Sequence, residues 1–361
     1  QTLFPYTTLF RSTLDLRTME FREHRPEDFL TKVSPVIYAP DADCPRWRTF
    51  ITEIMQGDKA RADYLQKAIG YSLTGDTRME CLFILYGPTS RNGKGTTMES
   101  ILRIMGEYGK NADPTMLQAK FNSQSGGPSE EIARLAGSRF VNISEPEKKI
   151  TLDAALTKRL TGNDTITARY LHENSFEFRP NFKIFINTNH RPNITDLTLF
   201  ESGRIKIIPF DRHFEENEQD KDLKSTFAKP ENMSGILNWM LEGYKLFRSQ
   251  GLAMPDSVVQ ATTDYQIFSD KMGQFFDECI EEKEGCELRR GAVYTRYKEW
   301  CGENGYRAEA AKNLNQEIEK RYKTARKRPN DGASSSTTPM VLDVAFTASE
   351  ESKEDFAPLT S

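Results

Sequence analysis

A glycine-rich segment with a single lysine is the strongest chemical signal in this sequence. It reads Gly-Pro-Thr-Ser-Arg-Asn-Gly-Lys-Gly-Thr from Gly87 to Thr96, between a strand-like apolar run and a helical stretch. In such a position backbone N–H groups and the start of the helix surround phosphate groups, and Lys94 reaches the β- and γ-phosphate oxygens of a nucleotide. The residues predicted to bind ATP are Gly87, Asn92, Gly93, Lys94, Gly95, Thr96 and Thr97.

The segment departs from the usual phosphate-binding loop at two points. Five residues separate Gly87 from Gly93 where four are usual, and Gly95 stands where a serine or threonine normally ligates Mg²⁺. Thr96 or Thr97 can take that place, so the sequence leaves the magnesium ligand open between them. The alternative is a glycine-rich turn that binds nothing, which the strand-to-helix setting disfavours.

Carboxylates follow the next strand-like run. Residues 139–144 form that run, and Glu145 and Glu147 come directly after it. A nucleotide-driven motor needs a carboxylate here to hold the Mg²⁺ shell and to activate the attacking water. We therefore predict catalytic roles for Glu145 and, as second choice, Glu147, and a Mg²⁺ site formed by Glu145 and Thr96. Two solvated surface glutamates are the alternative.

The elements that must position these residues alternate between strand and helix. Strand-like runs cover residues 81–86, 139–144, 182–188 and 205–210, and helical stretches cover 96–105, 130–135 and 152–160. Such alternation predicts an α/β fold with a parallel sheet.

Further polar motifs follow in a fixed order. The tetrapeptide TGND (161–164) is followed by Arg169, a strand-like run leads to Asn189, and Gly203-Arg204 precedes the last run. With the glycine-rich loop and the acidic strand end, this order resembles motifs A, B, B′ and C and the arginine finger of superfamily 3 helicases. The match is to the phage and plasmid primase-helicase family in particular, and to the C-terminal half of its poxvirus type.

The resemblance implies roles for individual residues. Asn189 would be a sensor whose amide orders water or the γ-phosphate, and Arg204 would reach the ATP of a neighbouring subunit in a homo-hexameric ring. A turn-forming asparagine and an ion-paired arginine at a strand start are the alternatives.

A hairpin that projects into the ring channel is also implied. Residues 165–171 and 176–182 have the period of paired strands, and the residues between them have turn chemistry. Arg169 and His172 near the tip, together with Lys158, are the predicted contacts to single-stranded DNA. An ordinary solvated hairpin is the alternative for His172.

The chain is predicted to divide into an AAA+-like ATPase core and flanking units. Residues 1–12 look like the translation of a sequencing-library adaptor and are predicted to be non-native. The remaining segments are a helical collar (13–75), the core (76–212), a helical connector (213–268), a winged-helix-like DNA-binding domain (269–348) and an acidic disordered tail (349–361). The basic run 320–328 is either a phosphate contact of the winged helix or a solvated helix end.

Composition narrows the class of protein. The 361 residues carry a net charge of −4, so the chain as a whole is not a basic DNA-coating protein. Five cysteines without a CxxC pair and four scattered histidines indicate reduced thiols and argue against a zinc site. The apolar runs are strand-sized, which predicts no membrane partner.

The sequence therefore predicts an ATP- and Mg²⁺-dependent DNA helicase of phage or plasmid replication, the helicase half of a primase-helicase, in the cytoplasm of a bacterial host. Single-stranded DNA would pass through the ring channel and duplex DNA would bind the winged helix. The alternatives are a nucleotide-switched winged-helix DNA-binding regulator and a DNA-packaging or remodelling ATPase. Asn189 and Arg204 favour a hydrolysing ring over a switch.

Overall fold

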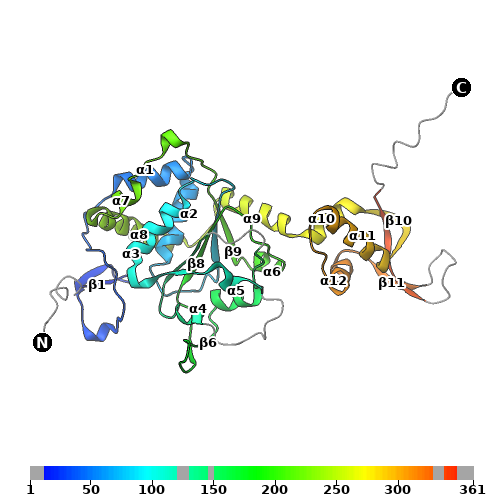
Figure 1. The fold of residues 1–361 in the computed structure, drawn as a ribbon, viewed down its shortest axis with the longest axis horizontal. Helices are drawn as coiled ribbons and strands as arrows, with labels where there is room; N and C mark the ends of the chain where they lie inside the picture. Colours follow the sequence, from blue (N-terminus) through cyan, green and yellow to red (C-terminus); the bar gives the residue numbers. More distant parts are fainter. Residues whose placement is uncertain (1–11, 120–129, 145–149, 328–336, 348–361) are drawn as a thin grey trace. The chain divides into compact units, whose positions relative to one another are not determined.

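The computed structural model describes residues 12–119, 130–144, 150–327 and 337–347. The chain divides after Ser269 into two compact units, which are described separately (Figure 1). In the described part of the chain, no helix is both long and apolar enough to cross a bilayer.

A five-stranded parallel sheet organises the first unit and confirms the predicted α/β fold. The strand order is β4-β5-β8-β3-β9. The strands are β3 (Leu82–Tyr86), β4 (Gly109–Ala112), β5 (Phe140–Ser144), β8 (Lys183–Thr188) and β9 (Ile205–Pro209). The sequence predicts four of these strands but misses β4, because its residues Gly-Lys-Asn-Ala lack the apolar pattern of a strand and lie at the sheet edge.

The two faces of the sheet carry separate apolar cores. On one face Phe185 stacks between Phe83 and Phe140, with ring centroids 4.8 Å apart in both pairs. Each such pair contributes about 0.5–1.5 kcal/mol beyond its buried area. Helix α3 (Lys94–Met105) covers this face, and the other face packs against α5 (Ala154–Thr161) and α9 (Asp256–Ser269).

A helical layer made of distant segments lies beside α3 (Figure 1). It contains α1 (Pro45–Ile54), α2 (Lys59–Tyr71), α7 (Leu223–Phe227) and α8 (Pro230–Gln250). Helices α2 and α8 approach closely through two glycines: a Cβ on Gly70 would lie 2.2 Å from the Tyr244 nitrogen, and one on Gly243 would lie 2.1 Å from the Gln66 oxygen. Segments predicted as collar and connector thus share one core.

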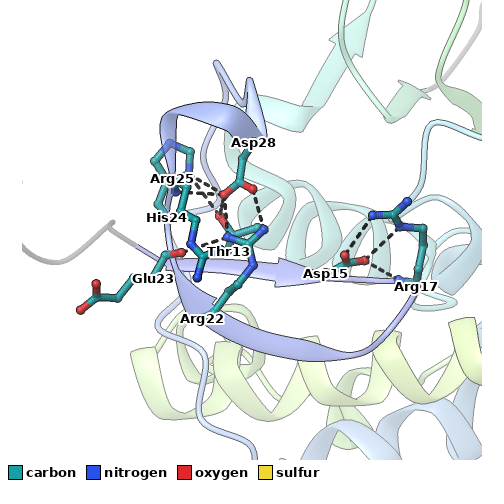
Figure 2. Close-up of polar contacts among 8 residues, drawn as sticks. All are labelled: Thr13, Asp15, Arg17, Arg22, Glu23, His24, Arg25 and Asp28. Carbon is teal, nitrogen blue, oxygen red and sulfur yellow. Dashed lines mark hydrogen bonds and ion pairs between the residues drawn. The ribbon is translucent and has the colours of Figure 1, made fainter.

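A β-hairpin precedes these helices, where the sequence suggests a helical segment. Strands β1 (Ser12–Asp15) and β2 (Glu20–Glu23) pair antiparallel. Figure 2 shows that the Asp28 carboxylate closes the hairpin by accepting hydrogen bonds from Thr13 Oγ1 at 2.9 Å and from Arg22 and the Arg25 amide at 3.0 Å. The Arg22 guanidinium holds the pKa of Asp28 well below its usual range.

Short elements complete the first unit. They are η2 (Pro26–Asp28), η3 (Gly106–Tyr108), η4 (Pro114–Leu117), α4 (Glu130–Ala133), β6 (Ile166–Ala168), β7 (Phe176–Phe178), α6 (Thr198–Glu201) and η5 (Glu216–Glu218).

The second unit packs three helices against a small antiparallel sheet. Its elements follow in the order α10 (Lys271–Cys279), β10 (Ile280–Arg289), α11 (Arg290–Glu303), α12 (Ala311–Arg321), β11 (Thr324–Lys327) and β12 (Thr338–Phe346). The sheet order is β10-β12-β11. Phe275, Tyr297 and Trp300 form its aromatic centre, with Phe275 and Tyr297 ring centroids 5.2 Å apart.

Candidate nucleotide-binding site

The glycine-rich loop connects β3 to α3 at the carboxyl edge of the parallel sheet, the edge at which such sheets bind ligands. Gly93 occupies the N-cap of α3 with φ at 86°, and a Cβ there would lie 2.4 Å from Ile54 Cγ2. Gly87 is confined as tightly, since a Cβ would lie 2.3 Å from the Phe210 carbonyl oxygen. Because a glycine cap has no side chain, the first N–H groups of α3 keep their capacity to bind an anion.

Lys94 and Asn189, which are 95 residues apart in the sequence, meet at this loop. The Lys94 Nζ donates to Asn189 Oδ1 at 2.6 Å and lies 3.4 Å from the Gly87 carbonyl oxygen. Lys94 is buried, whereas Asn189 is half-buried just after the end of β8. The structure therefore brings together the lysine of the loop and the polar residue that ends a neighbouring strand.

The two threonines after Gly95 differ in what their side chains do. Thr97 is fully buried, and its hydroxyl donates to the Gly93 carbonyl oxygen at 2.9 Å. Thr96 is half-buried and lines the cavity beside the loop, as Gly95 does. Of the two, only Thr96 lines the cavity, so the Mg²⁺ ligand stays a prediction that now falls on Thr96; Mg²⁺ takes few protein ligands and completes its shell with water and phosphate oxygens.

A cavity of about 560 Å³ lies in front of the loop. Its lining joins the first turn of α3 to the carboxyl ends of three strands. The predicted residues Asn92, Gly93, Lys94, Gly95, Thr96 and Asn189 all line it, together with Asn111, Asn142, Ser144, Asn187 and Lys224, for which the sequence analysis assigned no role.

The signal for the missed polar residues was a period of two within the strands. Asn142 and Ser144 share one face of β5, and Asn187 and Asn189 share one face of β8 and its end, because alternate residues of a strand point to the same side. A strand that is buried on both faces normally carries apolar side chains at these points.

The segment after β9 fixes the tip of the loop. The Phe214 amide donates to the Arg91 carbonyl oxygen at 2.9 Å, and His213 Nδ1 lies 2.9 Å from the Ser90 carbonyl oxygen. The Arg91 side chain also donates to Gln219 Oε1 at 2.9 Å. Sequence reasoning placed no contact here, because the segment has only a charged composition.

The predicted carboxylates Glu145 and Glu147 lie outside the described residues. The strand that leads to them, β5, ends at Ser144 on the rim of the cavity. Their catalytic roles therefore stay predictions, as does the Mg²⁺ site of Glu145 with Thr96.

Arg204 lies at the opposite edge of the sheet, at the start of β9. Its guanidinium donates to Glu80 Oε2 at 2.6 Å and to Thr161 Oγ1 at 2.9 Å, and its side chain is 16% exposed. This position, at the amino end of a parallel strand, separates Arg204 from the loop of its own chain. The structure brings it together with none of the other predicted catalytic residues that it describes.

The predicted hairpin exists but has shorter strands than the sequence suggests. Ile166 pairs with Phe178 and Ala168 with Phe176, so the turn spans residues 169–175. Arg169 and His172 are exposed in this turn, where His172 has φ at 64°.

The third predicted DNA contact, Lys158, lies on α5 and is already engaged. It donates to Asp196 Oδ2 at 2.9 Å and to Thr198 Oγ1 at 2.7 Å. Four of the six cations of the basic run in the second unit are also paired: Lys320 with Glu317, Arg321 with Asp270, Lys323 with Asp343 and Lys327 with Glu287.

Three segments of the chain match known sequence families. Residues 11–56 match the family described as "D5 N terminal like", residues 85–204 match "Family of unknown function (DUF5906)", and residues 268–347 match "Poxvirus D5 protein-like".

The similar curated proteins are viral. "Putative helicase L207/L206" of Acanthamoeba polyphaga mimivirus is 27% identical over 313 residues, which cover 80% of this chain and 32% of that protein. "Putative helicase 022R" of Frog virus 3 is 26% identical over 272 residues, covering 71% and 28%. The chain thus spans about a third of the length of these relatives.

Solved structures of the NrS-1 C-terminal region share the fold. One apo structure matches with a TM-score of 0.53 at 13% identity, covering 93% of this chain and 82% of that chain. A second matches with a TM-score of 0.51 at 14% identity, covering 84% and 77%.

Proposed function

The chain belongs to the D5-type primase-helicase family, and from that premise we propose that it is an ATP-dependent DNA helicase of superfamily 3. The observation that carries the proposal is the 2.6 Å contact between Lys94 and Asn189 at the uncapped start of α3. In ATP hydrolysis a phosphate-binding lysine and a polar sensor must both face the γ-phosphate, so that charge stabilisation and orientation act on the same group. The reaction is attack of water on the γ-phosphate of Mg²⁺-bound ATP.

Arg204 supports a ring as the working form. A guanidinium at the amino edge of the sheet cannot serve the loop at the carboxyl edge of the same chain, but it can face the ATP of a neighbouring copy. Its ion pair with Glu80 would then exchange for the phosphate as subunits assemble. We propose a homo-hexamer on this ground.

DNA contacts belong to two places in the proposal. The exposed turn with Arg169 and His172 would touch single-stranded DNA in the ring channel. The second unit, whose elements run helix, strand, helix, helix, strand, strand, would act as a winged helix on duplex DNA. The ion pairs of its basic run make that run a weaker phosphate contact than the sequence suggests.

The biological setting we propose is replication of a viral, phage or plasmid genome. The viral relatives support replication of a viral genome. The proposal also includes three narrower parts: a phage or plasmid origin, the cytoplasm of a bacterial host, and a link to a primase.

ATP turnover with and without single-stranded DNA tests the proposal. We expect Mg²⁺-dependent hydrolysis that rises when single-stranded DNA is added, and unwinding of a forked duplex. Nucleotide binding without turnover would instead support the nucleotide-switched regulator. Turnover that responds to duplex DNA, without strand separation, would support the packaging or remodelling ATPase.

A further inference from the structure

One face of the sheet changes from aromatic to polar along its strands. Phe140 on β5 and Phe185 on β8 stack under α3, and two residues further along each strand the same face carries Asn142 and Asn187. Both asparagines are buried, with exposed fractions of 3% and 7%. The polar band lies at the carboxyl edge, on the floor of the cavity that Lys94 also lines.

These side chains form a hydrogen-bonded row across three strands. The Asn142 Nδ2 donates to Asn111 Oδ1 on β4 and to Ser144 Oγ, both at 2.8 Å. The Asn187 Nδ2 donates to the same Ser144 Oγ at 3.0 Å. In this orientation both hydrogens of the Asn142 amide nitrogen are engaged.

That orientation leaves the Asn142 Oδ1 without a hydrogen-bond donor among the described residues. Burying an amide oxygen without a donor is unfavourable, and strands of this kind normally carry apolar residues at such positions. Asn142 also lines a roomy cavity with other polar groups, and a water molecule that enters from this cavity to reach the buried Oδ1 would supply the missing donor.

We propose that Asn142 positions the water that attacks the γ-phosphate, and that Ser144 holds the Asn142 amide in place for this task. The inference rests on the proposed ATPase function and adds a positioning group to which the motifs assign no role. The water donates one hydrogen to Asn142 Oδ1, which fixes its oxygen in the cavity shared with Lys94 and Asn189.

The chemical step then needs nothing from Asn142 except orientation. The water oxygen forms a bond to the γ-phosphorus as the bond from that phosphorus to the β–γ bridging oxygen breaks, which yields ADP and inorganic phosphate. A neutral amide takes up no proton, so the proton released by the water passes to a carboxylate or to the phosphate itself. Orientation of a nucleophile of this kind acts on kcat rather than on substrate affinity.

Replacing Asn142 by leucine separates positioning from structure. Asn142→Leu keeps the size of the side chain and continues the apolar face, so we expect an unchanged or higher melting temperature. We expect ATP affinity within about threefold of wild type and kcat roughly ten- to hundredfold lower. Unchanged kcat, or a loss of kcat that matches a loss of folded protein, would overturn the inference.

Ser144→Ala provides a second variant that is safe for folding, because Ser144 is exposed. Alone it should lower kcat several-fold, since the Asn142 amide loses one of its two acceptors. In the Asn142→Leu background it should have no further effect, because both changes remove the same water. Independent, multiplying effects of the two changes would contradict a shared role.

A matched control is Gln66→Met, which removes another buried amide of the same unit that is remote from the cavity lining. Gln66 Nε2 donates to the Trp239 carbonyl oxygen at 2.9 Å, so this change should lower stability and leave kcat unchanged. If wild-type protein hydrolyses no ATP, or Lys94→Ala does so normally, the proposed function itself fails. Lys94-dependent hydrolysis that survives Asn142→Leu would refute the positioning role alone.

Discussion

The polar side chains at the two edges of the parallel sheet differ in what they contact. At the carboxyl edge Lys94, Asn142 and Asn189 line an open cavity, and Asn142 Oδ1 has no hydrogen-bond donor among the described residues. At the amino edge Lys183 is bound within the chain, because its Nζ donates to the Thr74 carbonyl oxygen at 2.5 Å. Polarity alone therefore does not indicate a site, whereas a polar atom without a partner on a residue that lines a cavity does.

Two arginines complete the amino edge and follow the same rule. Arg139 donates to the Leu73 carbonyl oxygen at 2.7 Å and stacks over the Tyr108 ring, with 4.3 Å from Cζ to the centroid. Arg204 is paired with Glu80. The proposed arginine finger differs from the other two cations, because Arg204 has to leave Glu80 before it can reach a neighbouring subunit.

Arg204→Ala is expected to have the largest effect. If the guanidinium serves a neighbouring subunit, the variant should bind ATP with modest loss and hydrolyse it roughly 10³–10⁵-fold more slowly. Mixing it with Lys94→Ala protein should restore part of the activity, because some interfaces of a mixed ring then contain an intact loop and an intact finger.

Glu80→Gln is the matched control for Arg204. It removes the charge of the internal partner and keeps the guanidinium. If Arg204 is a finger, the Glu80→Gln protein should still hydrolyse ATP. If the pair is purely structural, Glu80→Gln and Arg204→Ala should both lower the stability of the protein. Wild-type activity that is independent of protein concentration down to a demonstrated monomer, with no rescue on mixing, would assign Arg204 to structure.

Lys94→Ala should reduce turnover by at least roughly 10²–10³-fold, because one preorganised cation at the transferring phosphate supplies much of the charge stabilisation. Steady-state hydrolysis and melting temperature should be measured together. Folding should survive, since the Lys94 Nζ hydrogen bonds to Gly87 and Asn189 lie at the cavity and not in either apolar core. Near-normal turnover would remove this cavity from the catalytic site.

The sequence predicts the carboxyl edge better than the amino edge for a physical reason. Gly87, Gly93 and Lys94 lie close together in one loop, so their spacing reveals a phosphate site before the fold is known. The shared location of Lys94 and Asn189 at the γ-phosphate was implied only by the resemblance to the helicase motifs, because the two residues lie far apart in the chain.

Other features depend on pairing that no local pattern records. The partners of Arg204 and Lys158, Glu80 and Asp196, are set by how distant strands and helices pack. The edge strand β4 and the hairpin β1–β2 escape detection because short edge strands lack an apolar period. The polar row of Asn142 and Asn187 follows a period of two that is visible in the sequence. Only the structure shows that these residues line the cavity.

Lys183 should make the free energy of unfolding depend on pH. Burial lowers the pKa of Lys183 to about 7, against 10.5 for a free lysine. Between these values the unfolded chain binds more protons than the folded one, so the free energy of unfolding rises with pH from about 7 to about 10, by roughly 2–5 kcal/mol. Below pH 7 both states are protonated and the effect is constant.

Chemical denaturation of wild type and Lys183→Met at pH 7 and pH 10 measures this effect. The variant should be as stable as wild type or more stable at pH 7, and its advantage should shrink by pH 10. Lys206→Met, which changes a half-buried lysine on β9, controls for the general loss of a cation. An advantage that is constant across this range would show that Lys183 keeps its ordinary charge in the folded protein.

The smallest expected effect compares an engaged and an exposed cation at the proposed DNA channel. Arg169 is exposed in the hairpin turn, whereas Lys158 is held by Asp196 and Thr198. If unused capacity marks function here too, Arg169→Ala should weaken single-stranded DNA binding at every sequence. It should also reduce the slope of log affinity against log salt by about 0.7, the value for one phosphate contact.

Lys158→Ala should leave that slope unchanged and slightly lower the melting temperature. Equal slope changes in both variants would mean that the Lys158 ion pair opens on DNA, and the contrast between saturated and unsaturated cations would then fail at this surface.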